Sequence, residues 1–317
     1  MSLAKDFETC FKPFGTQFCY RQARKAAMLT KLSTIVALQH ATTGILMLIR
    51  IGYDIELTLT APTALIYLLR VHPSREHDLR EPENVCVQPG LVATEYLDAF
   101  GNRCGRIQVP PQVSSVRLTN QAVVYDSGLP DAVDYGAYQH APEELPSEVL
   151  QFLLPSRYCE VDSELLGFAW SQFGGSPLGW GRVQAICDFV HQRIRFDYNQ
   201  ARSNRSALQG FHEQTGVCRD FAHLAVTLCR CMNIPARYAT GYLGDIGIPP
   251  VRYPMDFSAW FEVYLGGSWH TFDARHNTPR IGRVVMARGR DAGDVPITMT
   301  FGPNALTRFE VTTEEAL

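Results

Sequence analysis

Apolar and polar residues alternate along the first third of the chain in the manner of β-strands. The alternation, or a short apolar run rich in β-formers, occupies four segments, at residues 48–60, 63–72, 94–109 and 114–128. Phe100-Gly101-Asn102 lies inside the third segment and is a predicted hairpin tip. Short strands separated by turn residues are typical of an antiparallel β-sandwich, so we expect one here.

The period changes to that of helices further along. Residues 180–196 and 218–232 each place their apolar side chains on one helical face, which predicts two helices that face a core. Three strand patterns follow, at residues 236–243, 257–265 and 268–274, and Gly266-Gly267 between the last two is a two-residue hairpin signal. Helices followed by an antiparallel sheet predict an α+β fold.

The chain divides into three predicted parts. Residues 136–165 concentrate proline and acidic residues around a short apolar piece, which favours a connection over a packed element. We therefore expect a β-sandwich domain at 47–145 and a second domain at 146–317. Residues 1–46 carry basic residues and no acid after Glu8, and we expect them to be an extension outside the fold. A weak membrane-surface or targeting segment stays open as the alternative.

Composition excludes some classes of function and favours one cellular location. The 317 residues carry a net charge of −3 and no long block of like charge, so the chain lacks the basic surface that a nucleic acid would need. No apolar run is free enough of polar residues to span a membrane. Nine cysteines without framework spacing favour a reducing, cytoplasmic setting. They form no zinc motif, and we expect neither a metal nor another cofactor.

Cys218 is the residue with the most chemical interest. It follows Gly216-Val217 at the start of the predicted helix 218–232, and its spacing to Ala222 and Ala225 places it on the apolar stripe of that helix. One interpretation is a small buried hydrophobe, the usual role of an unpaired cysteine. The other is a nucleophile, because the first turn of a helix offers unpaired N–H groups and the positive end of the dipole.

A cysteine nucleophile needs a general base and a group that orients it. If Gly266-Gly267 forms a two-residue loop, Leu265 faces Ser268, and the register pairs Trp260 with Asp273 and Ser258 with Arg275. Ser258 and Asp273 then lie diagonally on one face of the hairpin. This geometry calls for a histidine at position 258, where the chain has serine.

These motifs together resemble the transglutaminase-like superfamily of papain-type cysteine enzymes. The matching pieces are the sequences "GVCRDFA", "NIPARYATGY", "SAWFEVYLGGSWHTFDARHN" and "ARGRDAGDVP". They resemble the bacterial branch with an N-terminal β-sandwich, and the resemblance extends over residues 47–317. It implies that Cys218 is the nucleophile and that Asp273 is the orienting carboxylate. Ser258 stands where the family has its histidine.

Three other histidines could replace the missing one. His276 pairs with Phe257 in the predicted register and points to the opposite face, so it serves as a base only if the strand bends or ends after Asp273. The asparagine and proline that follow it are typical of such an ending. His223 lies about 140° around the helix from Cys218, which favours a helix-surface or interface role. His270 is on the wrong face of the hairpin.

Three residues are candidates for substrate binding. Ser258 and Arg275 share a face of the hairpin with Asp273, and Arg275 could stabilise a thiolate, although it cannot accept a proton. Trp260 lies beside the same row. It is a candidate wall of a substrate channel or, alternatively, a core tryptophan.

Two functions remain open from the sequence. The first is a cysteine amidase, peptidase or acyl transferase that acts on a peptide-like amide through a thioester of Cys218, with His276 as its base. The second is a catalytically impaired relative that binds a peptide or another amide-bearing partner. Cys218 together with Asp273 favours the enzyme, and Ser258 favours the binding module.

Overall fold

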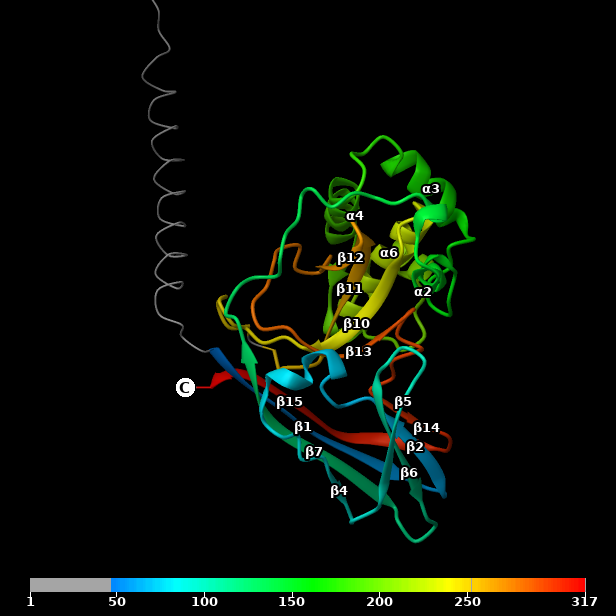
Figure 1. Ribbon diagram of the computed structural model, residues 1–317. Helices are drawn as coiled ribbons and strands as arrows, with labels where there is room; N and C mark the ends of the chain where they lie inside the picture. Colours follow the sequence, from blue (N-terminus) through cyan, green and yellow to red (C-terminus); the bar gives the residue numbers. More distant parts are fainter. Residues whose placement is uncertain (1–46, 252, 317) are drawn as a thin grey trace, which may run out of the picture. The chain divides into compact units, whose positions relative to one another are not determined.

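The computed structural model describes residues 47–251 and 253–316, so the predicted extension 1–46 lies outside the described residues. The described residues form one compact unit of helices and antiparallel sheets (Figure 1). The α+β fold class predicted from the sequence is confirmed.

The N-terminal strands form two antiparallel sheets, drawn in the lower part of Figure 1. One sheet has the order β15-β1-β7-β3, with β4 also paired to β7, and the other has the order β14-β2-β6-β5. The strands of the first sheet are β1 (Met47–Leu59), β3 (Leu79–Glu81), β4 (Cys86–Gln88), β7 (Ser115–Asp126) and β15 (Asn304–Ala316). Those of the second are β2 (Thr63–Tyr67), β5 (Ala93–Leu97), β6 (Arg103–Val109) and β14 (Thr298–Thr300).

Alternation of burial along β1 explains why these sheets pack. Every second residue from Met47 to Leu59 is buried, because successive side chains of a strand point to opposite faces. These residues share one apolar cluster with Leu65 and Ile107 of the other sheet.

The first and last strands of the described residues pair in this region. The strands β14 and β15 belong to the predicted second part, 146–317, but they pair with β2 and β1 of the first part. The apolar cluster also takes in Tyr242 and Met286 from beyond residue 145. The sandwich thus shares its apolar cluster with residues of a further sheet, described next.

The second region is built on a sheet of order β12-β11-β10-β13, all antiparallel. Its strands are β10 (Ala236–Tyr242), β11 (Ser258–Leu265), β12 (Ser268–Phe272) and β13 (Val284–Gly289). Gly266 and Gly267 have φ of 56° and 86°, as a two-residue hairpin loop of type I′ requires. Leu265 pairs with Ser268, as predicted, and the ladder continues to Phe261 and Phe272, where it stops.

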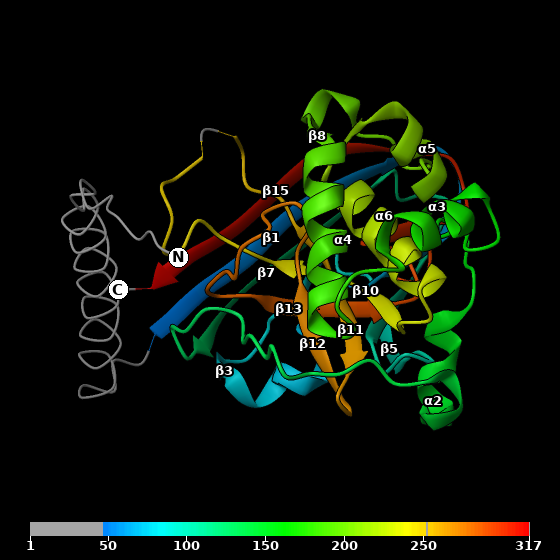
Figure 2. The same cartoon turned by 90° about the horizontal axis from the view of Figure 1, so that it is seen from above.

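Helices cover one face of this sheet (Figure 2). They are α3 (Glu164–Phe173), α4 (Trp180–Arg193), α5 (Ala207–Glu213) and α6 (Cys218–Cys231). The one-turn helix α2 (Ser147–Leu150) precedes them in the chain. The two helices predicted from the apolar period correspond to α4 and α6. The central helix is α6, which packs against β11 and against α3, α4 and α5. From Asp220 to Cys231 every residue of α6 is buried.

One prediction for this region is wrong. The segment 136–165 was expected to be a connection without a packed element, but it contains α2 and the short 3-10 helix Gln151–Leu153. Val149, Phe152 and Cys159 are buried there. Helices of one turn are too short to show a 3.6-residue period. The prolines around them are typical of connecting segments, so the sequence did not indicate that these side chains are packed.

Candidate active site

Cys218 is the first residue of α6, and a buried ion pair fixes the start of that helix. The Asp220 carboxylate accepts a hydrogen bond from the Val217 N–H at 2.8 Å and another from Arg205 Nη1 at 2.9 Å. Asp220 is 1% exposed and Arg205 is 2% exposed. Arg219, the residue before Asp220, donates to backbone oxygens of residues 202 and 203.

The thiol of Cys218 is half-buried and is neutral at neutral pH. Burial raises its pKa to about 11, the nearby Arg275 opposes that rise, and Asp256 adds to it. Loss of water thus outweighs the favourable charge of Arg275 at this helix start. Cys218 must lose its proton to a base as it reacts.

A turn after β12 brings His276 back to Asp273. The strand ends at Phe272, and the Asn277 N–H donates to the Asp273 carbonyl oxygen at 2.7 Å. Asn277 adopts a left-handed φ of 51°, which asparagine tolerates better than most residues. His276 Nδ1 then lies 2.8 Å from Asp273 Oδ2. The strand ending that the sequence suggested as the condition for this arrangement is present.

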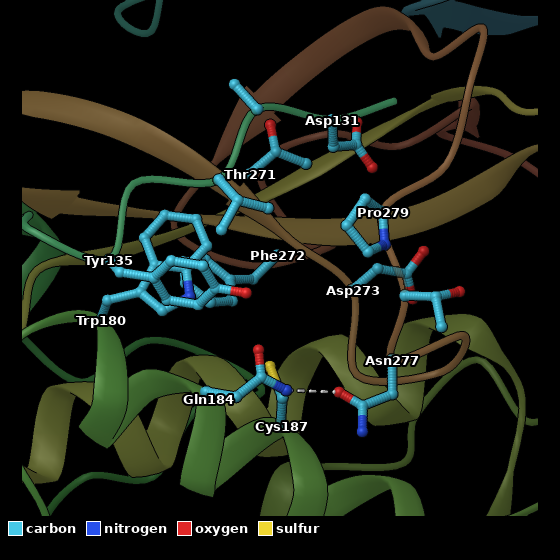
Figure 3. Close-up of a pocket in the computed structure, with 13 residues that line it drawn as sticks. Asp131, Tyr135, Trp180, Gln184, Cys187, Thr271, Phe272, Asp273, Asn277 and Pro279 are labelled. Carbon is cyan, nitrogen blue, oxygen red and sulfur yellow. Dashed lines mark hydrogen bonds between the residues drawn. The ribbon is translucent and has the colours of Figure 1, made fainter. Parts of the chain in front are cut away.

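Side chains of α4 hold this turn in place. Gln184 Nε2 donates to Asn277 Oδ1 at 2.9 Å, and Asn277 Nδ2 donates to Asp188 Oδ1 at 2.8 Å (the first of these bonds is dashed in Figure 3). His191 Nδ1 lies 2.9 Å from the Arg275 carbonyl oxygen. Gln184, Asp188 and His191 are spaced to lie on one face of a helix. Sequence reasoning missed them, although this polar stripe was visible beside the apolar one.

Asp273 is ionised and fully engaged in hydrogen bonds. Its Oδ1 accepts from the N–H groups of Arg275 and His276, and its Oδ2 is shared by His276 Nδ1 and Arg283 Nη2, each at 2.8 Å. Burial raises the pKa of the Asp273 carboxyl, but Arg283 and His276 outweigh burial and hold it well below its usual range. Arg283 was another residue that the sequence did not indicate.

Cavities lie on both sides of the turn. One, of about 250 Å³, is lined by Ser258, Arg275 and His276 together with Asp256 and a wall of apolar and aromatic side chains. Arg275 and Asp256, which line it, are also the two charged groups with the largest influence on the Cys218 thiol. A smaller cavity, behind the turn, is lined by Tyr135, Trp180, Phe272, Asp273 and Asn277 (Figure 3).

Not every candidate residue is brought to the larger cavity. Trp260 is 2% exposed, lies beneath the Arg283 guanidinium, and faces a different cavity that contains Glu262 and Arg288. The sequence predicts a helix-surface or interface role for His223, but the residue is fully buried. It stacks on Tyr158, and its Nε2 accepts from the Ala292 N–H at 3.1 Å.

Two further findings concern only residues 47–251 and 253–316. They contain no group of three or more histidine, cysteine or acidic residues that could hold a metal ion. Among these residues, no helix has both the length and the apolar character needed to cross a bilayer.

Comparisons with known proteins agree on the family. Residues 171–274 match the family described as the transglutaminase-like superfamily. The uncharacterized protein ML0607 of Mycobacterium leprae is 30% identical over 234 residues, which are 71% of this chain and 82% of the relative. The uncharacterized protein Rv2569c of Mycobacterium tuberculosis is 26% identical over 225 residues, 63% of this chain and 68% of the relative.

A solved structure adds the fold. The crystal structure of a candidate cysteine protease from Cytophaga hutchinsonii is 30% identical and superposes with a TM-score of 0.73. The match covers 85% of this chain and 91% of that one. The chain therefore belongs to the transglutaminase-like superfamily.

Proposed function

We propose that the chain is a cysteine-dependent amidase, peptidase or acyl transferase that acts on a peptide-like amide through a thioester of Cys218. The observation that carries this proposal is the contact between His276 Nδ1 and Asp273 Oδ2 at 2.8 Å. It supplies an oriented imidazole in a chain that has serine at the family's histidine position. Because Asp273 is ionised, Nδ1 carries a hydrogen and Nε2 is left as the acceptor.

The reaction proceeds in two stages. As the Cys218 sulfur bonds to the amide carbonyl carbon, its proton passes to His276 Nε2, and the carbonyl oxygen takes up the negative charge. Backbone N–H groups at the start of α6 are suited to stabilise that oxygen. The imidazolium then protonates the leaving nitrogen, the C–N bond breaks, and a thioester remains.

The second stage releases the acyl group. A water molecule or an amine attacks the thioester carbonyl, and His276 Nε2 removes its proton. The C–S bond breaks, and the sulfur takes that proton back. Asp273 keeps the imidazole oriented and stabilises its cation throughout. Ser258 and Arg275 line the cavity beside His276, and we assign them to substrate binding.

A second candidate function is a peptide-binding module. One observation favours it, namely Ser258 at the family's histidine position, and the burial that raises the pKa of the Cys218 thiol is consistent with it. Such a module keeps the cavity and lacks the reaction.

Acylation by a generic activated ester separates the two candidates. A Cys86→Ser background removes the exposed thiol of Cys86, and intact-mass measurement with peptide mapping reports the adduct. We expect an adduct on Cys218, none in Cys218→Ser, and a rate lowered by about 10² to 10⁴ in His276→Ala. An inert parent chain would favour the binding module, and unchanged acylation in His276→Ala would remove His276 from the mechanism.

We also propose a location for the protein, a reducing compartment such as the cytoplasm, because cysteines without disulfide spacing are typical of such a setting. The seven cysteines in the described part of the chain are all free thiols there, which supports this location.

A further inference from the structure

Arg283 lies just before β13 and is held between two carboxylates. Its Nη2 donates to Asp273 Oδ2 at 2.8 Å, and its Nε donates to Asp131 Oδ2 at 2.8 Å. The residue is 8% exposed, and its guanidinium lies 5.0 Å from the centroid of the Trp260 ring. Contacts on three sides keep the guanidinium beside Asp273.

The oxygen that Arg283 contacts is the one that His276 uses. Asp273 Oδ2 receives both Arg283 Nη2 and His276 Nδ1, so a cation and the imidazole share one oxygen atom. Asp131, Arg283 and Asp273 thus form a row of charges with alternating sign that ends at the His276 imidazole. Asp131 comes from the segment that follows β7, which ties this segment to the candidate site.

The row has an electrostatic consequence for the imidazole. A carboxylate beside a histidine favours the protonated ring, whereas a cation beside that carboxylate offsets part of the effect. The negative charge of Asp131 in turn offsets part of the charge of Arg283. We propose that Arg283 is a positioning residue that holds Asp273 and limits the basicity of His276, and that Asp131 sets how strongly it does so. The inference deepens the proposed function, in which His276 is the base.

Other titratable groups around the turn that carries His276 come from several elements and stay constant in the test. The cavity wall contributes acidic, basic and phenolic groups, α4 contributes an acid and a histidine that hold the turn, and the thiol of α6 is influenced by Arg275 of the turn. These groups are Tyr198, Asp245, Tyr253, Asp256, Arg275, Arg280, Asp188, His191 and Cys218.

The test measures the pKa of His276 directly, by NMR titration of the full chain with isotope-labelled histidine. The His276→Gln variant assigns the signal. In Arg283→Gln we expect the pKa of His276 to rise by about one unit, and in Arg283→Lys, which keeps the charge, to stay near the parent value. In Asp131→Asn we expect it to fall by roughly half a unit, because Arg283 loses its second carboxylate.

Asp134→Asn is the matched control. Asp134 lies in the same segment, and among the described residues its carboxylate accepts a hydrogen bond only from the Gly136 N–H, so removal of its charge should leave the titration unchanged. General destabilisation would shift the pKa of His276 in the same direction in both variants. Opposite shifts in Arg283→Gln and Asp131→Asn therefore cannot arise from it. If Arg283→Gln does not fold, the Asp131→Asn variant alone tests the inference. An unchanged or raised pKa of His276 in Asp131→Asn overturns it.

This experiment is independent of turnover. If the parent chain forms no acyl adduct while the two variants shift the pKa of His276 as expected, the proposed function fails and the electrostatic role of Arg283 stands. If the adduct forms and the pKa does not move, the enzyme stands and the role of Arg283 is overturned.

Discussion

The two ends of the candidate site are held by different means. Cys218 begins a helix whose first turn is fixed by Asp220 and Arg205, both almost fully buried. His276, by contrast, has 22% of its side chain exposed, and it sits on a turn held by polar side chains from α4 and by Arg283. The end with the proposed nucleophile, Cys218, is part of the core, while the end with the proposed base, His276, is an assembly of hydrogen bonds at the margin of that core. Such an assembly can supply a histidine from a new position without a change in the core.

The largest effect is expected at the nucleophile end. Asp220→Ala leaves the buried Arg205 without Asp220 and the Val217 N–H without an acceptor, and we expect the free energy of unfolding to fall by about 3 to 5 kcal/mol. Urea unfolding measures this loss. Arg202 is the matched control, because it pairs with Glu213 at the surface, where it is 42% exposed. Arg202→Ala should cost less than about 1 kcal/mol, and equal losses in the two variants would contradict the comparison.

Low pH should destabilise the chain mainly through Asp273, beside His276. The pKa of Asp273 lies below its usual value in the folded chain, so its ionised form adds stability above about pH 4, and that stability is lost as the pH falls below 4. At pH 7 we expect the free energy of unfolding of the parent chain to exceed that of Asp273→Asn by about 2 to 3 kcal/mol. Urea unfolding measured from pH 7 to pH 3 should show this difference becoming smaller as the pH falls. A gap that is constant over this range would mean that Asp273 acts through packing alone.

The same contrast explains what the sequence could predict. The hairpin register follows from Gly266-Gly267, and the helix that begins at Cys218 follows from its apolar stripe, because both are local patterns with a fixed period. The pairing of Arg205 with Asp220 and of Arg283 with Asp273 joins residues that no period relates, so the structure was needed to find them. The strands β14 and β15 were also missed, since their partners lie more than 200 residues earlier in the chain.

A smaller effect should follow from loosening the turn itself. Asp188 Oδ1 accepts from both Gln184 and Asn277, so Asp188→Ala removes the acceptor that fixes Asn277. We expect a loss of about 1 to 2 kcal/mol in stability and, because His276 is then poorly oriented, about a tenfold slower acylation of Cys218. Asp188→Asn keeps a carbonyl oxygen at the same place, so it should retain most of the stability and most of the acylation rate of the parent chain. Equal behaviour of the two variants would show that the charge of Asp188, rather than its acceptor, matters.

The smallest effect is expected from restoring the family's histidine. In Ser258→His the new ring enters the cavity that His276 lines, but Asp273 already accepts four hydrogen bonds, from two backbone N–H groups, His276 and Arg283. A carboxylate has about four such sites, so it cannot orient a second imidazole, and we expect acylation of Cys218 to change by less than about threefold.

The double variant Ser258→His with His276→Ala sharpens this result, because it vacates one site on Asp273 Oδ2 for the new ring. We expect the double variant to acylate Cys218 faster than His276→Ala alone, with thermal unfolding confirming that both are folded. A large gain in Ser258→His alone, from an inert parent chain, would contradict the idea that His276 has taken over the base position. It would show instead that the turn after β12 is only structural, and that the chain became a binding module when position 258 became serine.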